Sequence, residues 1–141
     1  MTPTEVADVQ QSFMKVTPVA DQVGMMFYGR LFDLDPSLRP MFAEDLTEQS
    51  RKLLHVLAVA ANGLTHPDTL VPVVQALGAK HVDYGVKDQH YDTVGQALIW
   101  TLETGLADAF TPQVKSAWLS AYTLLSGIMK DAAAKRVAAQ A

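Results

Sequence analysis

The chain has 141 residues, of which 49% are hydrophobic and 18% are charged, and its formal net charge at pH 7 is −4. The length is that of one domain, and the eleven scattered basic side chains argue against a nucleic-acid partner, which needs clustered Lys and Arg. There are no cysteines, which excludes disulfides, thiolate metal sites, iron–sulfur clusters and cysteine nucleophiles. The hydrophobic surplus fits either an oligomer interface or a large apolar ligand.

No segment of the sequence is typical of a membrane span or a secretory signal. The longest apolar run, residues 53–61, is interrupted by His55 and is far too short to cross a bilayer. The first residues include the acidic Glu5 and Asp8 rather than a basic segment before an apolar one. We therefore expect one soluble, cytoplasmic domain over residues 1–141, without a membrane span.

Proline and capping residues mark the places where helices are expected to begin. A capping oxygen precedes proline in four pairs: Thr2–Pro3, Thr17–Pro18, Asp35–Pro36 and Thr111–Pro112. Glu5 completes a capping box with Thr2, in which each residue accepts a hydrogen bond from the backbone of the other. Thr47 and Asp88 are two further expected N-caps, and Pro67 is expected to open another helix.

Apolar residues between these starts recur at helical spacing, and no stretch alternates with period two for long enough to predict a strand. The spacing predicts an all-α fold of about seven helices, over residues 3–16, 18–34, 36–42, 48–64, 67–77, 79–84, 88–107 and 112–136. The fifth and sixth of these segments can form one element bent at Gly78. The alanine-rich tail after Asp131 is expected to fray.

One of the four histidines is a candidate metal ligand. His81 alone shares a helical face with apolar neighbours, Leu77 and Tyr84. The other three are expected at solvated or boundary positions: His55, His66 and His90. In a helical chain without cysteine, such a histidine suggests a buried haem with one open iron position. Taken alone, it is more often an ordinary core or surface residue.

Other side chains can likewise be read either as part of a haem site or as ordinary structural residues. The hydroxyl of Tyr91 could meet the ring nitrogen of His81 that is not on iron, or Tyr91 could be an ordinary core aromatic residue. The Tyr28 hydroxyl needs a partner if it is buried, which could be a backbone carbonyl or a ligand on iron. Phe42 could be a core residue and Gln49 a surface residue. Only their joint order and spacing favour a cofactor site.

That order and spacing resembles the globins, and more closely the bacterial single-domain haemoglobins and the globin half of flavohaemoglobins. The segments that carry the resemblance span essentially the whole chain: MFYGRLF at 26–32, PSLRPMF at 36–42, QSRKL at 49–53, KHVDYGV at 80–86, HYDTVG at 90–95 and AWLSAY at 117–122.

The resemblance implies a single-domain globin fold around haem b, which is iron protoporphyrin IX. His81 would be the proximal ligand of a five-coordinate iron, and Phe42 the aromatic residue that stacks against the porphyrin. Tyr28, Gln49 and Leu53 occupy the distal tyrosine, glutamine and leucine positions, where no histidine is present.

Four further positions follow from the resemblance. Lys52 is expected at the pocket rim, paired with a haem propionate, and Val86 against the proximal face of the porphyrin. Tyr91 is expected beside His81. The glutamate that accompanies this pair in flavohaemoglobins is replaced by Ala133, so we expect a less anionic imidazole, which disfavours peroxidase-like chemistry.

The implied function is reversible binding of dioxygen for storage, delivery or buffering, with CO and NO as further ligands. The alternative is a nitric oxide dioxygenase that depends on a separate reductase, since no glycine-rich dinucleotide signature occurs in the chain. A third possibility is a helical interaction module without a cofactor.

Overall fold

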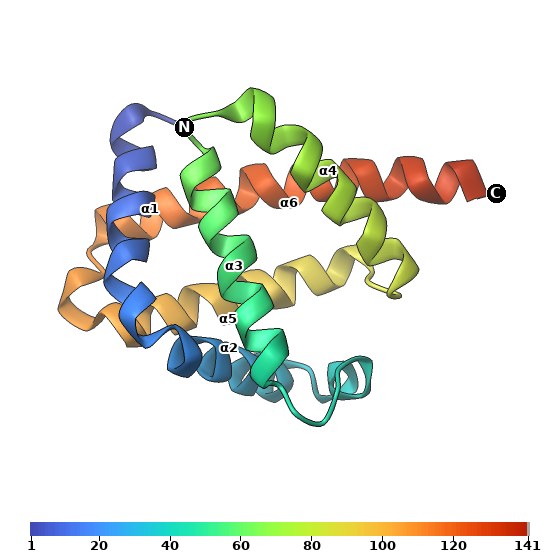
Figure 1. Ribbon diagram of the computed structural model, residues 1–141, viewed down its shortest axis with the longest axis horizontal. Coiled ribbons are helices and arrows are strands. Elements are labelled where there is room, and N and C mark those ends of the chain that lie inside the picture. Colours follow the sequence, from blue (N-terminus) through green and yellow to red (C-terminus); the bar gives the residue numbers. More distant parts are fainter. Residues whose placement is uncertain (141) are drawn as a thin grey trace.

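A computed structural model describes residues 1–140 and shows six α-helices and three 3-10 helices over that range, with no strand (Figure 1). The elements in chain order are α1 (Pro3–Val16), η1 (Thr17–Val19), α2 (Ala20–Leu34), η2 (Pro36–Met41), α3 (Thr47–Gly63), α4 (Pro67–Asp83), α5 (Asp88–Leu106), η3 (Ala107–Ala109) and α6 (Pro112–Gln140). The all-α prediction is therefore confirmed.

Local capping explains several helix starts. Thr2 and Glu5 form the expected capping box at α1. Asp35 caps η2 by accepting from the amide of Ser37, and Thr111 accepts from the amide of Val114 at the start of α6. Each of these side chains satisfies a backbone donor that the helix itself leaves free.

Three of the expected N-caps are wrong. Thr17 ends α1 instead, where its hydroxyl donates to the Phe13 carbonyl. Thr47 is the first residue of α3, and its amide donates to the Asp45 carboxylate at 2.9 Å. Asp88 is likewise the first residue of α5 rather than its cap. The N-cap of α3 is therefore Leu46, one residue earlier than expected, and it offers no side-chain hydrogen bond.

Of two expectations about the later helices, one is confirmed and one is wrong. Residues 67–77 and 79–84 form one element, which the sequence allowed, because α4 continues through Gly78 to Asp83. The alanine-rich tail does not fray before Gln140, because α6 remains helical to that residue. No helix among residues 1–140 combines the length and apolar composition that a membrane crossing needs.

The helices cross one another around one main hydrophobic cluster, which draws on α1, α2, η2, α3, α5 and α6. Within it, the indole of Trp118 in α6 donates to the buried Ser12 hydroxyl of α1 at 2.8 Å. Helix α4 contributes no residue to this cluster and packs most extensively on α6 (Figure 1). Helix α4 also meets α3 where Gly63 lies against Leu70, but it has no extensive contact with α2, which carries Tyr28.

Candidate functional site

His81 lies in the last turn of α4 and is half-buried. Its Nδ1 atom is buried and has no hydrogen-bond partner among residues 1–140. Burial lowers the pKa of His81 below its ordinary value, because removing the ring from water disfavours the charged form. The imidazole is therefore neutral at pH 7, the state in which a histidine can bind a metal.

The chain beyond His81 is held by a glycine-dependent helix end. Gly85 has a φ of +85°, a conformation that other residues rarely adopt. Its amide donates to the Val82 carbonyl, and the amide of Val86 donates to the His81 carbonyl, each at 3.0 Å. This pair of bonds is the Schellman arrangement, which closes the helix and turns the chain back. It places the backbone of Val86 directly against that of His81.

Tyr91 is buried in α5, and its ring centre lies 6.3 Å from that of His81. The hydrogen bond expected between the two side chains is not formed, because the Tyr91 hydroxyl and the His81 Nδ1 are both buried without a partner. Burial, and to a lesser extent the charge of Asp88, raises the pKa of Tyr91. The two rings are neighbours, as predicted, but each retains an unused polar atom.

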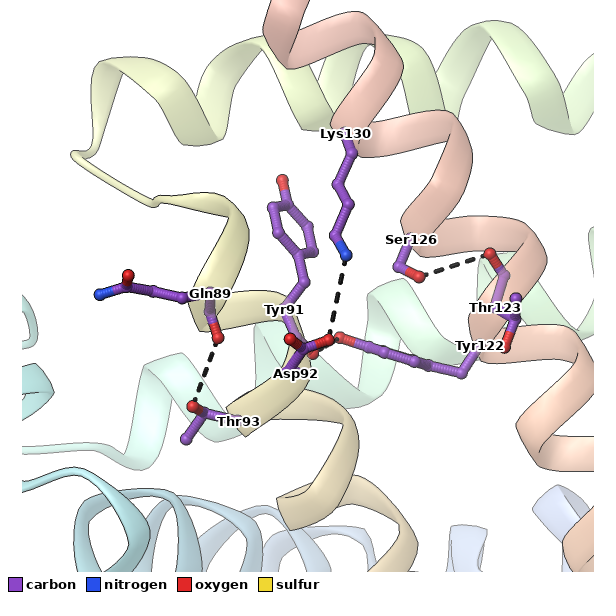
Figure 2. A network of polar contacts seen from close by, with 8 residues as sticks. All are labelled: Gln89, Tyr91, Asp92, Thr93, Tyr122, Thr123, Ser126 and Lys130. Carbon is purple, nitrogen blue, oxygen red and sulfur yellow. Dashed lines mark hydrogen bonds and ion pairs between the residues drawn. The ribbon is translucent and has the colours of Figure 1, made fainter.

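An ion pair lies beside Tyr91 (Figure 2). Lys130 of α6 lies 5.8 Å from the centre of the Tyr91 ring and 3.9 Å from the Asp92 carboxylate. The hydroxyl of Tyr122 donates to the Tyr91 carbonyl at 2.5 Å. Ala133 is buried and brings only a methyl group to this part of α6. Tyr91 therefore has the paired Lys130 beside its ring and no carboxylate from position 133.

Tyr28, which is 3% exposed, lies among aromatic side chains of α2 and the chain after η2. Its ring centre is 5.4 Å from that of Phe42 and 6.1 Å from that of Phe32. Burial raises the pKa of Tyr28, and a hydrogen bond from the Gln49 amide partly offsets this effect. The tyrosine therefore keeps its proton at neutral pH and remains a hydrogen-bond donor.

Arg39 fixes the position of Phe42, a role that the sequence pattern did not reveal. Its guanidinium donates to the carbonyls of Phe42 at 3.3 Å, Ala43 at 3.0 Å and Glu44 at 2.9 Å. It also lies 5.2 Å above the Phe32 ring. Because one side chain satisfies three consecutive carbonyls, the loop after η2 has a defined path.

Gln49 and Leu53 reach the site because α3 crosses α2 closely. The contact lies at Gly24, where an added Cβ would come within 2.5 Å of the Ser50 Cβ. Tyr28 follows Gly24 by one helical turn, and Gln49 directly precedes Ser50. The crossing therefore brings the tyrosine and the glutamine onto neighbouring surfaces of the two helices.

The remaining predicted residues lie at the margin of the site. Lys52 is largely exposed and pairs with Glu48 at 3.6 Å, so its expected contact with a propionate stays a prediction. The ring centre of Tyr84 lies 6.3 Å from that of His81, as expected, but Tyr84 is 62% exposed and so does not form a buried apolar face. His55 and His66 are exposed as expected, whereas the half-buried His90 accepts from the Lys87 amide at the start of α5.

Two open surface hollows lie away from these residues. One, of about 480 Å³, is formed by the N-terminus and α6, and the other, of about 620 Å³, by α5 and α6. Their linings include Leu119 in both cases and none of the predicted haem-contacting or distal residues.

The residues present fit a haem. One helix offers a neutral imidazole with a lone pair for iron, and its buried Nδ1 still lacks a partner. Other helices offer an aromatic side chain for the porphyrin face and two hydrogen-bond donors, Tyr28 and Gln49. This is the ligand chemistry that a single-histidine haem site requires. Fold and site together are those expected of an all-α protein that holds a haem through one histidine.

Comparison with known proteins identifies the family. The Globin family model matches residues 25–129, so the chain belongs to the globin family. Membership of this family supports binding of diatomic gases at a haem. The fold agrees with that of a bacterial globin from Campylobacter jejuni, at a TM-score of 0.83 and 22% identity, covering 95% of this chain and 97% of that one.

Sequence relatives include proteins of two kinds. The flavohemoprotein of Bacillus subtilis is 34% identical over 114 residues, which are 74% of this chain and 28% of that protein. The flavohemoprotein of Bordetella parapertussis is 32% identical over 106 residues, 73% of this chain and 26% of that protein. Neuroglobin of Danio rerio is 29% identical over 126 residues, 79% of each chain. The chain thus spans little more than a quarter of the flavohemoproteins, and the resemblance to globins is confirmed.

Proposed function

We propose that the protein reversibly binds dioxygen at a five-coordinate haem b, for storage, delivery or buffering. The observation that supports this proposal is the buried Tyr28, which keeps its proton and lies beside the Gln49 amide. When bound through His81, the haem supplies a ferrous iron whose open position takes dioxygen, CO or NO.

The distal side chains discriminate between these gases. Bound dioxygen carries partial negative charge, so a hydrogen bond from the Tyr28 hydroxyl or the Gln49 amide stabilises it more than neutral CO. A donor to a charged acceptor contributes about 1.5–3 kcal/mol, which is roughly a ten- to hundredfold gain in affinity. Leu53 and Phe42 fill space around the ligand and keep out water, which promotes oxidation of the iron.

The proximal side chains tune the imidazole. The Tyr91 ring lies beside His81, and Ala133 brings no carboxylate to this part of α6. Without a carboxylate to take up the Nδ1 proton through Tyr91, the imidazole stays neutral rather than anionic. This arrangement suits reversible ligand binding better than cleavage of an O–O bond.

Absorbance spectra of the ferric, ferrous and oxygenated protein test the proposal. We expect a Soret band in all three states and a distinct oxygenated spectrum that reverts when oxygen is removed. The variant His81→Ala should lose its haem or change colour. A variant that retains tightly held haem with an unaltered spectrum would contradict the role of His81.

A second candidate function is conversion of nitric oxide to nitrate with electrons from a separate reductase. The similarity to flavohemoproteins over 74% of the chain favours it, and the same distal donors serve it. Mixing the oxygenated protein with NO tests whether nitrate forms. Sustained nitrate formation with a flavin reductase and NADH would establish catalysis, whereas a single turnover would leave reversible binding as the function.

A further inference from the structure

The last two turns of α6 contact the end of α4 that carries His81. Arg136 Nη2 lies 3.2 Å from Asp83 Oδ2, and the Gln140 side-chain amide donates to Asp83 Oδ1 at 3.4 Å. Asp83 is the final residue of α4 and follows His81 by two positions. Both oxygens of one carboxylate are therefore held by α6, directly after the iron ligand.

A second contact lies on the other side of His81. Gly78 precedes His81 by three positions, and an added Cβ at Gly78 would come within 2.5 Å of the Met129 carbonyl oxygen. The backbones of α4 and α6 thus approach at a distance that only glycine permits here. Because this contact involves backbone and the Asp83 contact involves side chains, they restrain α4 in different ways.

The α6 residues that make these contacts form one continuous helical surface. Met129, Ala133, Arg136 and Gln140 are separated by four, three and four positions, which puts them on the same face of a helix. Ala133 is buried between the two contacts in the sequence of α6. Its small side chain is compatible with a close approach of the two helices.

Charge explains why Asp83 needs a partner. The carbonyl end of a helix favours cations and disfavours a carboxylate, so Asp83 is unfavourable at the end of α4 when it stands alone. The Arg136 guanidinium offsets this charge. The side chains of Arg136 and Asp83 are 45% and 44% exposed, so the energy of the pair is that of a partly solvated one.

We propose that the last two turns of α6 form a clasp, made of Arg136 and Gln140 on Asp83, that fixes the orientation of His81 toward the haem iron. Arg136 and Gln140 are then positioning residues for the proximal ligand. This inference rests on the proposed role of His81. It also accounts for the part of α6 beyond Asp131, which contributes no residue to the main hydrophobic cluster.

The test compares Arg136→Gln with Lys135→Gln in the haem-bound protein. Both variants remove one positive charge from the same turn of α6, but among residues 1–140 Lys135 pairs only with Asp131 of its own helix, at 3.3 Å. Hydrogen exchange of amides 79–83 reports the mobility of α4. The iron–histidine stretching band of the ferrous protein, measured by resonance Raman, reports the orientation of His81.

We expect Arg136→Gln to accelerate exchange at 79–83 by about two- to fivefold, the effect of losing a partly exposed pair. The iron–histidine band should shift or broaden, and Lys135→Gln should change neither. Gln140→Ala should act in the same direction with a smaller effect. In a double-mutant cycle, the variant with both Asp83→Asn and Arg136→Gln should exchange amides 79–83 no faster than either single variant, because both changes remove the same contact.

Three results would overturn the clasp. Equal effects of Arg136→Gln and Lys135→Gln would show that only charge matters. Faster exchange with an unmoved iron–histidine band would show that the contact restrains α4 but not the ligand. Additive effects in the double-mutant cycle would show that Asp83 and Arg136 act independently. If the unmodified protein shows no iron–histidine band at all, the proposed role of His81 fails instead.

Discussion

At the scale of single residues, the Tyr28 hydroxyl is the group whose removal should change gas binding most selectively. Tyr28→Phe keeps the aromatic contacts with Phe32 and Phe42 but removes the donor. We expect the dioxygen dissociation rate to rise about ten- to hundredfold, because a donor to a partly charged ligand is lost. Stopped-flow displacement of dioxygen by CO measures this rate.

The matched control for that experiment is Tyr84→Phe, which removes a hydroxyl from a side chain that is 62% exposed. It should leave the dioxygen dissociation rate unchanged. CO dissociation should change far less than dioxygen dissociation in Tyr28→Phe. An unchanged dioxygen rate in Tyr28→Phe would remove Tyr28 from the distal site.

The burial of His81 should make the free energy of unfolding depend on pH, and it determines the sign of that dependence. Burial lowers its pKa in the folded protein below the ordinary 6.5. As the pH falls below 6.5, the unfolded chain binds a proton that the folded chain resists, so the free energy of unfolding decreases. The free energy of unfolding continues to decrease until the pH passes the pKa of His81 in the folded protein. Urea unfolding of the haem-free protein at several pH values measures this decrease.

His81→Leu should flatten this dependence, since the residue that resists the proton is gone. The control is His55→Gln, at an exposed position of α3, which should retain the slope of the parent protein. A slope that survives in His81→Leu would assign the pH dependence to another group.

At the scale of elements, the crossing of α2 and α3 sets the distance between the two distal donors. Gly24→Ala would place a Cβ within 2.5 Å of the Ser50 Cβ, so the helices must separate. We expect a loss of about 1–3 kcal/mol in the free energy of unfolding, as for other overpacked cores. The dioxygen dissociation rate should rise as well, because Gln49 moves away from Tyr28.

Gly29→Ala in the same helix is the matched control. No atom lies within 4 Å of a Cβ at this position. Because alanine favours a helix interior over glycine by about 1 kcal/mol, this variant should be slightly more stable than the parent. Urea denaturation measures the free energy of unfolding of both variants. Equal changes in Gly24→Ala and Gly29→Ala would contradict the role of the crossing.

The helix boundaries show which information is local. The bounds of α1 could be predicted because Thr2, Pro3 and Glu5 interact within one turn. Gly78 left open whether one helix or two occurs here, because its missing side chain serves a contact with Met129, far along the chain. The last turns of α6 were likewise expected to fray, since their partner Asp83 lies more than fifty residues away.

The candidate site shows the same division. The resemblance placed Tyr28, Phe42 and Tyr91 at positions that the structure finds buried or half-buried. Arg39 escaped notice because its partners are backbone carbonyls, which leave no pattern of residue types. Tyr84 lies beside His81 as the spacing predicted, but it follows the last residue of α4 and is exposed.

At the scale of the whole molecule, the two sides of the site belong to different parts of the core. The main hydrophobic cluster includes Tyr28 and has Phe42 and Leu53 packed against it, but no residue of α4. Leu70 and Val74 of α4 and Tyr91 of α5 are buried outside that cluster. A haem held by His81 and stacked on Phe42 would join the two parts through one apolar body.

Haem should therefore stabilise α4 more than any other helix. A ligand that binds only the folded state raises the free energy of unfolding by about 4 kcal/mol when its free concentration is a thousandfold above its dissociation constant. Amide hydrogen exchange of the loaded and haem-free proteins should show the largest gain in protection over residues 79–83. α1 should gain least, because its buried side chains already belong to the main cluster. His81→Ala should abolish the difference between the two helices. A gain of equal size in α1 and α4 would mean that haem stabilises the fold as one unit and does not bridge two parts of it.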